Sequence, residues 1–171
     1  MARSVELRRH TDNDGDVLTA GGVAAAVALG LSGGYEVVVS SGAQRATQTA
    51  ACAIAGLGER IPGGVVVEPG LRSGAEGRWR AAYREAGAGD LESLRAADPQ
   101  LIEADAARLG EALQRVFDRL EDGRRALAFG HSPTNEAAVW GLTGETIRPL
   151  GKGEGVLITE DDGAYRVDRL G

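Results

Sequence analysis

Short apolar runs alternate with helical patterns along the chain, and this alternation constrains the fold more than any other feature. Strand-like runs rich in aliphatic residues lie at residues 4–9, 35–40, 65–67 and 126–129. Apolar residues recur at helical spacing between the later runs, most clearly over residues 99–120. Alternation of this kind is typical of an α/β sandwich, in which helices cover a mostly parallel sheet.

The C-terminal residues break the alternation. Residues 155–159 and 164–167 flank the turn sequence Asp161-Asp162-Gly163, a pattern typical of a β-hairpin. Such a hairpin makes the predicted sheet mixed rather than purely parallel.

Residues 69–99 fit neither pattern. Trp79, Tyr83 and Leu91 are suitable anchors for short helices. These helices would be interrupted by glycines, namely Gly74, Gly77, Gly87 and Gly89. We therefore expect an irregular lid at about 69–99, within a single domain that spans residues 1–171.

Two local features of the N-terminal region lead to specific expectations. Thr19 is a favourable N-cap, and Val23, Val27 and Leu31 follow at helical spacing up to Gly33-Gly34, where the helix should end. Glu6 lies inside the first strand-like run. If that strand is buried, the Glu6 carboxylate needs a cationic or hydrogen-bonding partner, which the sequence does not identify.

Composition and charge exclude several classes of protein. Of the 171 residues, 43% are apolar, which argues against disorder. The net charge of -6 and the lack of a long Lys/Arg run argue against a nucleic-acid partner. No apolar run approaches the roughly 20 residues of a membrane span, and there is no signal-peptide pattern. The single cysteine, Cys52, rules out an internal disulfide, so we expect a cytoplasmic protein.

The only two histidines of the chain each follow a predicted strand directly. Arg9-His10 ends the first run, and His131 follows the run at 126–129. Arg45 lies one turn into a helix that begins after another strand. Taken singly, each is readily explained as an ordinary polar residue at a strand end or helix surface. Together they favour an anion site, because imidazole supplies a nucleophile or base and guanidinium binds phosphate oxygens in a bidentate way.

Taken in order, these residues resemble the signature of the histidine phosphatase superfamily, in its phosphoglycerate-mutase-like branch of small phosphatases. The resemblance runs from Val5 to about Trp140 and rests on four segments: Arg9-His10, Leu18-Thr19-Ala20-Gly21-Gly22, Ser40-Ser41 with Arg45 and Thr49-Ala50, and Gly130-His131. It implies a three-layer α/β/α sandwich around a mostly parallel sheet. It also implies chemistry through a phosphohistidine intermediate.

The same resemblance implies roles for individual residues. His10 would be the nucleophile that accepts the phosphoryl group, and Arg9, Arg45 and His131 would line the phosphate pocket. Asn13 would match a polar position that also contacts phosphoryl oxygens. No metal or other cofactor is implied, since catalysis would consist of positioning and charge stabilisation.

The chain departs from the family pattern at three positions. Thr11 follows His10 where Gly is usual, which raises the question of whether the loop differs. Ser73 stands where the family usually places an acidic proton donor, and Ser132 replaces the Asp of the acid-phosphatase branch. Glu76 is the first substitute for the missing acid and Glu85 the second, although both are equally well explained as ordinary surface charges.

We therefore expect a metal-independent phosphatase that acts on a small phosphomonoester or on phosphohistidine. One alternative is a phosphate-binding module of the same fold with little or no turnover, which Thr11 and Ser73 motivate. Phosphoglycerate-mutase-type phosphoryl transfer is a second alternative, less favoured because the chain is short. A nucleotide binder is the weakest, because Gly56-Leu57-Gly58 lacks the third glycine of a dinucleotide loop. The partner is a small phosphorylated substrate, with no nucleic acid or membrane, and the sequence leaves the oligomeric state open.

Overall fold

A mixed six-stranded sheet forms the centre of the protein. The computed structural model describes residues 2–170. The strands lie in the spatial order β5 (Val65–Val67), β4 (Val37–Ser40), β6 (Arg125–Gly130), β1 (Arg3–Arg9), β7 (Gly155–Asp161) and β8 (Ala164–Leu170). The first four strands are parallel to one another, β7 pairs with β1 in the antiparallel direction, and β8 pairs antiparallel with β7. The expected mixed sheet with a C-terminal hairpin is thus confirmed.

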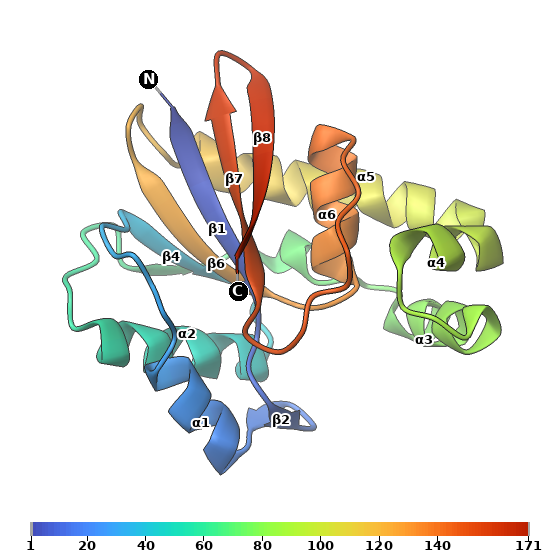
Figure 1. Cartoon of the computed structure of the whole chain (residues 1–171), viewed down its shortest axis with the longest axis horizontal. Helices are drawn as coiled ribbons and strands as arrows, with labels where there is room; N and C mark the ends of the chain where they lie inside the picture. The colour runs from blue at the N-terminus through green and yellow to red at the C-terminus, as the bar shows by residue number, and fades with distance from the viewer. Residues whose placement is uncertain (1, 171) are drawn as a thin grey trace.

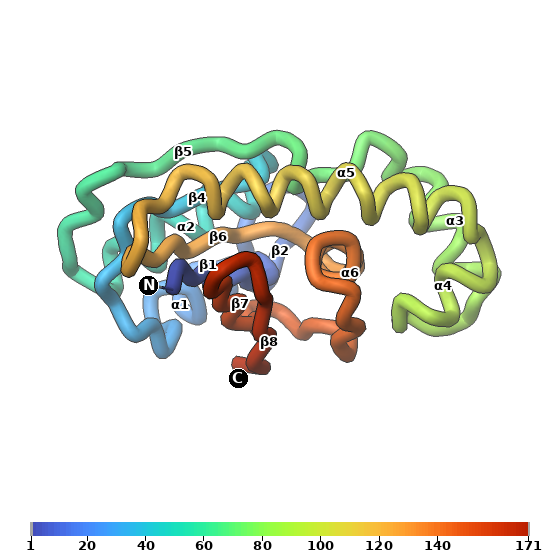
Figure 2. Tube along the Cα trace, turned by 90° about the horizontal axis from the view of Figure 1, so that it is seen from above, coloured from blue at the N-terminus to red at the C-terminus, as the bar shows by residue number. Residues whose placement is uncertain are grey.

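Alternating residues of each strand supply the two faces of the sheet. Val5, Leu7, Val39 and Ala128 point into the larger apolar cluster, beneath helices α5 and α6. The intervening residues of β4 and β6 pack into a second cluster with α2. Figure 1 shows α1 and α2 on one side of the sheet, and Figure 2 shows α5 running along the other side. This is the three-layer α/β/α arrangement that the sequence resemblance implies.

The helices are α1 (Ala20–Val27), α2 (Gln44–Leu57), the single 3₁₀ turn η1 (Pro69–Leu71), α3 (Glu76–Ala86), α4 (Leu91–Ala97), α5 (Pro99–Asp118) and α6 (Thr134–Thr143). A small two-stranded ribbon, β2 (Asn13–Asp14) with β3 (Val17–Leu18), precedes α1. Helices α5 and α6 approach closely through Gly110 and Gly141, because a Cβ on Gly141 would lie 1.9 Å from the Ala106 carbonyl oxygen. Within residues 2–170, no helix combines the length and the apolar character needed to cross a bilayer.

The first helix differs from expectation in its end and its buried face. Thr19 is its N-cap, with the side chain accepting a hydrogen bond from the Gly22 amide, but the helix ends at Val27 instead of continuing to Gly33-Gly34. Val23 and Val27 are exposed, and the buried residues are Gly22 and Ala26. The reason is that the helix packs closely against the backbone of Asp12 at Gly22, where a Cβ would lie 2.0 Å from the Asp12 carbonyl oxygen. The helix therefore packs through its small residues.

Residues 69–99 are more regular than expected. They contain η1, α3 and α4, which extend the molecule beyond the sheet (Figure 1). Gly87 does not interrupt α3 but ends it, in the left-handed conformation (φ 68°) that glycine adopts without strain. Trp79 anchors α3 through its indole nitrogen, which donates to buried Asp105 of α5 at 2.7 Å.

The buried Glu6 carboxylate has the partners that burial demands. Arg8 Nε donates to Glu6 Oε2 at 2.6 Å, and the Tyr35 hydroxyl donates to Glu6 Oε1 at 2.8 Å. All three residues are 3% exposed or less. Glu6 and Arg8 are two residues apart on one strand, so the pleat places their side chains on the same face.

Candidate active site

The two histidines meet at the carboxyl edge of the sheet. Arg9 of β1 pairs with Gly130 of β6 in parallel register, so His10 and His131 leave neighbouring strands at the same level. Their ring centroids are 5.3 Å apart in an edge-to-face arrangement, at an interplanar angle of 62°. Parallel strands thus bring together two side chains that are far apart in the sequence.

His10 is held in the tautomer suited to nucleophilic attack. Its Nδ1 lies 2.8 Å from the Thr11 carbonyl oxygen, which can only accept a hydrogen bond, so Nδ1 carries the proton and Nε2 has a free lone pair. Burial is the main cause that lowers the His10 pKa to about 4, and the positive charges of Lys152, Arg45 and Arg9 act in the same direction. The ring is therefore neutral near pH 7.

Thr11 fits the position where the family usually has glycine. Its amide donates to Thr49 Oγ1 at 3.2 Å, and its hydroxyl donates to the Gly22 carbonyl oxygen at 2.8 Å. Among residues 2–170, Asp162 is the one non-glycine residue with a positive φ, so the Thr11 backbone carries no left-handed strain. Thr11 therefore joins the His10 loop to α1 and α2.

His131 is also neutral. Its Nε2 is 2.8 Å from the Ser41 hydroxyl, and its Nδ1 is buried without a hydrogen-bond partner. Burial lowers the His131 pKa to about 3, helped by the positive charges of Arg45 and Arg72. An unpartnered ring nitrogen in a pocket lined by arginines is available to a ligand oxygen.

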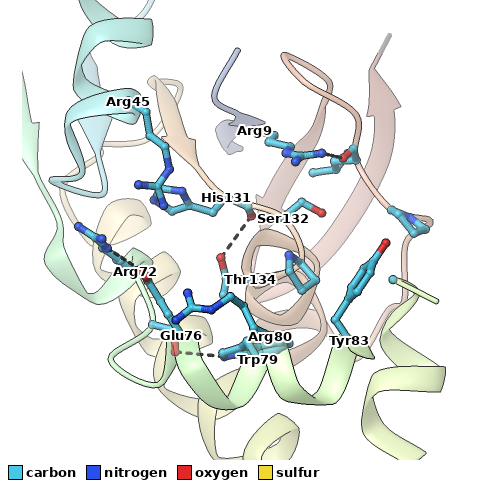
Figure 3. Close-up of a pocket in the computed structure, with 15 residues that line it drawn as sticks. Arg9, Arg45, Arg72, Glu76, Trp79, Arg80, Tyr83, His131, Ser132 and Thr134 are labelled. Carbon is cyan, nitrogen blue, oxygen red and sulfur yellow. Dashed lines mark hydrogen bonds and ion pairs between the residues drawn. The ribbon is translucent and has the colours of Figure 1, made fainter. Parts of the chain in front are cut away.

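The pocket beside His131 has a volume of about 470 Å³, and Arg9, Arg45 and Arg72 are three of the four arginines in its lining. Figure 3 shows Arg9 and Arg45 on opposite sides of His131 in that view. Arg9 Nη1 donates to the Leu150 carbonyl oxygen at 2.9 Å, while Arg9 Nε is buried without a partner. Arg45 Nη1 forms an ion pair with Asp16 at 2.8 Å. Arg72 completes the set, and together the three guanidiniums suit an anion with several oxygens.

The other predicted site residues have different surroundings. Neither His10 nor Asn13 is among the residues that line this pocket, although His10 lies against His131, which does. The Asn13 side chain donates to the Gly15 carbonyl oxygen at 2.7 Å and accepts from Lys152. Glu76 does line the pocket, but it forms an ion pair with Arg72 at 2.7 Å. The hydrogen bond from Arg72 lowers the Glu76 pKa, so this carboxyl is ionised at neutral pH. Glu85 is exposed and lies outside the pocket lining.

The mouth of the pocket is built from α3 and the loop before β7. Trp79 and Tyr83 of α3 supply aromatic surface there (Figure 3), and Pro149 and Leu150 supply apolar surface from the loop. Pro133, which directly precedes α6, adds further apolar surface to the lining. Arg80 adds a further positive charge to the lining.

Ser73 is part of the pocket lining and is held in place by Asp105. It stands where the family usually has its acid, and its hydroxyl donates to Asp105 at 2.5 Å. Asp105 accepts from Trp79 as well, so one buried carboxylate fixes both the η1–α3 connection and the first turns of α3.

Sequence reasoning missed Glu136, in the first turn of α6. Its side chain is 1% exposed, and Ser132 Oγ donates to Glu136 Oε2 at 2.5 Å. Burial raises the Glu136 pKa to about 7. A signal was present in the sequence, because Glu136 directly precedes the apolar run Ala137-Ala138-Val139 and follows His131 by little more than one helical turn.

No group of three or more His, Cys, Asp or Glu side chains within residues 2–170 is arranged to hold a metal ion. The chemistry that the described groups offer is therefore that of two neutral imidazoles, several guanidiniums and a buried carboxyl.

Solved structures with the same fold come from several organisms. YhfR of Bacillus stearothermophilus has 20% identity and a TM-score of 0.73, with 98% of this chain and 96% of that chain covered. A phosphoserine phosphatase from Entamoeba histolytica has 16% identity and a TM-score of 0.73, with 99% and 97% covered. An alpha-ribazole phosphatase from Shigella flexneri has 17% identity and a TM-score of 0.65, with 98% and 95% covered. These likenesses establish the fold.

Sequence comparison assigns the family. No curated protein matches the chain at a significant level. A family model, in contrast, matches residues 3–150, which include the Arg9-His10 pair, Arg45 and His131. This chain therefore belongs to the histidine phosphatase superfamily, branch 1.

Proposed function

We propose that this protein is a metal-independent phosphatase that hydrolyses a small phosphomonoester or phosphohistidine through a phosphohistidine on His10. The observation that carries the proposal is the edge-to-face pair of His10 and His131, 5.3 Å between ring centroids, beside a pocket lined by Arg9 and Arg45. A neutral nucleophile and flanking guanidiniums are the groups that in-line phosphoryl transfer requires.

Each residue has a defined role in this proposal. His10 Nε2 attacks phosphorus, so a P–N bond forms as the P–O bond to the leaving group breaks. Arg9 and Arg45 hold the equatorial oxygens, and His131 contributes a ring nitrogen to the same oxygens. Water then attacks the phosphohistidine, which releases phosphate and restores the free imidazole.

The dimensions and lining of the pocket suit a small substrate. A volume of about 470 Å³ accommodates a phosphoryl group and a modest organic portion. Trp79 and Tyr83 at the mouth would contact that portion, and Arg80 is placed to attract a second negative charge. The names phosphoserine phosphatase and alpha-ribazole phosphatase, given to two of the similar structures, support phosphoester hydrolysis as the reaction class.

The main rival is a phosphate-binding module of the same fold with little or no turnover. Two observations favour it: Ser73 replaces the usual acid, and Glu76 is held ionised by Arg72. Phosphoglycerate-mutase-type transfer is the other alternative, supported by the mutases among the similar structures. We propose a cytoplasmic location and a small phosphorylated substrate, without a nucleic-acid or membrane partner.

Hydrolysis of p-nitrophenyl phosphate tests the proposal. We expect turnover in the presence of a chelator, inhibition by vanadate, and an acid-labile phosphoenzyme in rapid-quench samples. His10→Ala should abolish both turnover and the phosphoenzyme, while Cys52→Ser, a change outside the pocket lining, should leave them intact. Full activity of His10→Ala refutes the mechanism, and tight phosphate binding without turnover of a broad substrate panel favours the binding module.

A further inference from the structure

A phosphatase needs a proton for the leaving-group oxygen, and the following inference rests on the proposed function. Neither the position where the family usually has its acid nor the two substitute acids on α3 meets this need. Ser73 is engaged with Asp105, Glu76 is ionised in its pair with Arg72, and Glu85 lies outside the pocket lining. The proton must come from another part of the pocket wall.

Ser132 is a polar group on that wall, directly after His131. Ser132 is part of the pocket lining, and its hydroxyl makes a 2.5 Å hydrogen bond to Glu136 Oε2. Figure 3 places Ser132 on the same side of His131 as Arg9, away from Arg45. A hydroxyl can accept a proton on one side while it donates one on the other, so Ser132 can connect the pocket to the carboxyl behind it.

Glu136 has the surroundings of a neutral carboxylic acid. The side chain is 1% exposed, and its Oε1 is buried without a hydrogen-bond partner. Burial is the dominant influence and raises the Glu136 pKa to about 7. Three smaller influences lower this pKa: the hydrogen bond from the Ser132 hydroxyl, backbone hydrogen bonds at Glu136 and Leu150, and the charge of Arg9 on β1. Near neutral pH the group therefore holds a proton that it can release.

We propose that Ser132 protonates the leaving-group oxygen and that Glu136 resupplies the proton from behind. In the neutral form, Glu136 Oε2–H donates to Ser132 Oγ, which turns its own hydrogen toward the pocket. As the P–O bond breaks, the leaving oxygen takes the Ser132 hydrogen, and Ser132 takes the Glu136 proton. The resulting carboxylate faces the Arg9 guanidinium. When water attacks the phosphohistidine, one water proton returns through Ser132 to Glu136, which closes the cycle.

Leaving groups of different basicity test this relay. An alkyl phosphate needs the proton, whereas p-nitrophenolate leaves without it. Glu136→Gln and Ser132→Ala should each lower kcat/KM for an alkyl phosphate by about 10²–10⁴-fold and should change kcat/KM for p-nitrophenyl phosphate by less than about threefold. The comparison uses kcat/KM because this constant covers the departure of the leaving group but not the later hydrolysis of the phosphohistidine, which is common to both substrates. Glu145→Gln, the same change at an exposed residue just after α6, is the matched control and should leave both rates unchanged. Retained p-nitrophenyl phosphate hydrolysis also shows that each variant is folded.

The pH profile supplies a readout that a merely structural role would not change. For the wild type, kcat with an alkyl phosphate should fall as pH rises through about 7, because Glu136 loses its proton. In Glu136→Gln, kcat for the alkyl phosphate should no longer fall as pH rises through this range. In parallel, ¹³C NMR of labelled glutamate carboxyls should show one group that titrates near 7 and is missing from Glu136→Gln.

Three results overturn the relay. The first is an equal loss of activity on both substrates in the variants, the second is a fall of kcat with rising pH that persists in Glu136→Gln, and the third is the absence of a glutamate that titrates near 7. These failures differ from failure of the proposed function. In that case the wild type hydrolyses neither substrate, or His10→Ala retains full activity.

Discussion

Asp16 and Arg45 form an ion pair, 2.8 Å between Oδ1 and Nη1, at the N-terminus of α2. A phosphate that binds Arg45 must share the guanidinium with this carboxylate and tolerate its charge. We predict that Asp16→Asn, which keeps an oxygen acceptor but removes the charge, tightens competitive inhibition by phosphate by up to about fivefold, the scale of an exposed ion pair. Asp14→Asn, a change at a nearby exposed carboxylate, should have little effect. Weaker inhibition in Asp16→Asn would mean that Asp16 mainly orients Arg45.

The neutral state of His10 makes folding stability depend on pH. The unfolded imidazole binds a proton below about 6.5, whereas the folded one, whose pKa is lowered to about 4, does not until the pH is much lower. Acid therefore favours the unfolded state, and stability is lost as pH falls from about 6.5 to 4. Because asparagine does not titrate, the free energy of unfolding of His10→Asn should decrease by about 2–3 kcal/mol less over this pH range than that of the wild type. Urea unfolding of both proteins across the range measures the difference. Parallel curves for the two proteins would contradict the lowered pKa.

Asp105 should affect substrate binding more than chemistry. It accepts hydrogen bonds from Ser73 and Trp79, and Trp79 lines the pocket mouth. Asp105→Ala leaves the buried Ser73 hydroxyl without its acceptor, and leaves the Trp79 indole with only its 3.0 Å bond to Ser73 Oγ. The change should cost about 1–3 kcal/mol of stability and raise KM more than it lowers kcat. Thermal unfolding and steady-state kinetics measure the two effects. Arg108→Ala removes the largely exposed partner of the same carboxylate, 3.5 Å away, and should change neither quantity appreciably.

The buried pair of Glu6 and Arg8 predicts a large loss of stability. Glu6→Ala removes the carboxylate that the buried Arg8 guanidinium faces, at a cost of about 3–5 kcal/mol. Tyr35→Phe removes a single hydroxyl from the same carboxylate and should cost about 1 kcal/mol. Chemical denaturation separates the two effects. Losses of equal size would show that the ion pair contributes no more than the tyrosine bond.

The sequence predicted those features that depend on strand periodicity and on the ends of strands. The mixed α/β sheet, the C-terminal hairpin and the position of both histidines at strand ends follow from where short apolar runs end. The three-layer arrangement came from the family resemblance. The Arg8 partner of Glu6 was also open to prediction, because a spacing of two residues places both side chains on one face of a strand. Tyr35 was not, because the contact depends on tertiary packing.

Other features escaped prediction for identifiable physical reasons. The apolar spacing of Val23 and Val27 indicated a buried face, but close backbone contact at Gly22 turned the small residues inward instead. Gly87 was interpreted as interrupting a helix, whereas its position just after the last turn makes it a terminator. The importance of Glu136 depends on how deeply it is buried, which residue identity alone does not reveal.

The contacts of β1 have a consequence for the order of events during biosynthesis. Arg8 and Arg9 donate to the carbonyl oxygens of Gly153 and Leu150, which lie 145 and 141 residues later in the chain, and β1 sits between β6 and β7. β1 is thus synthesised well before β6 and β7, the two strands that become its neighbours. His10 is synthesised well before its tertiary surroundings, which are complete only when the β7–β8 hairpin has been made. A nascent chain stalled before residue 150 should therefore carry His10 without the complete pocket around it.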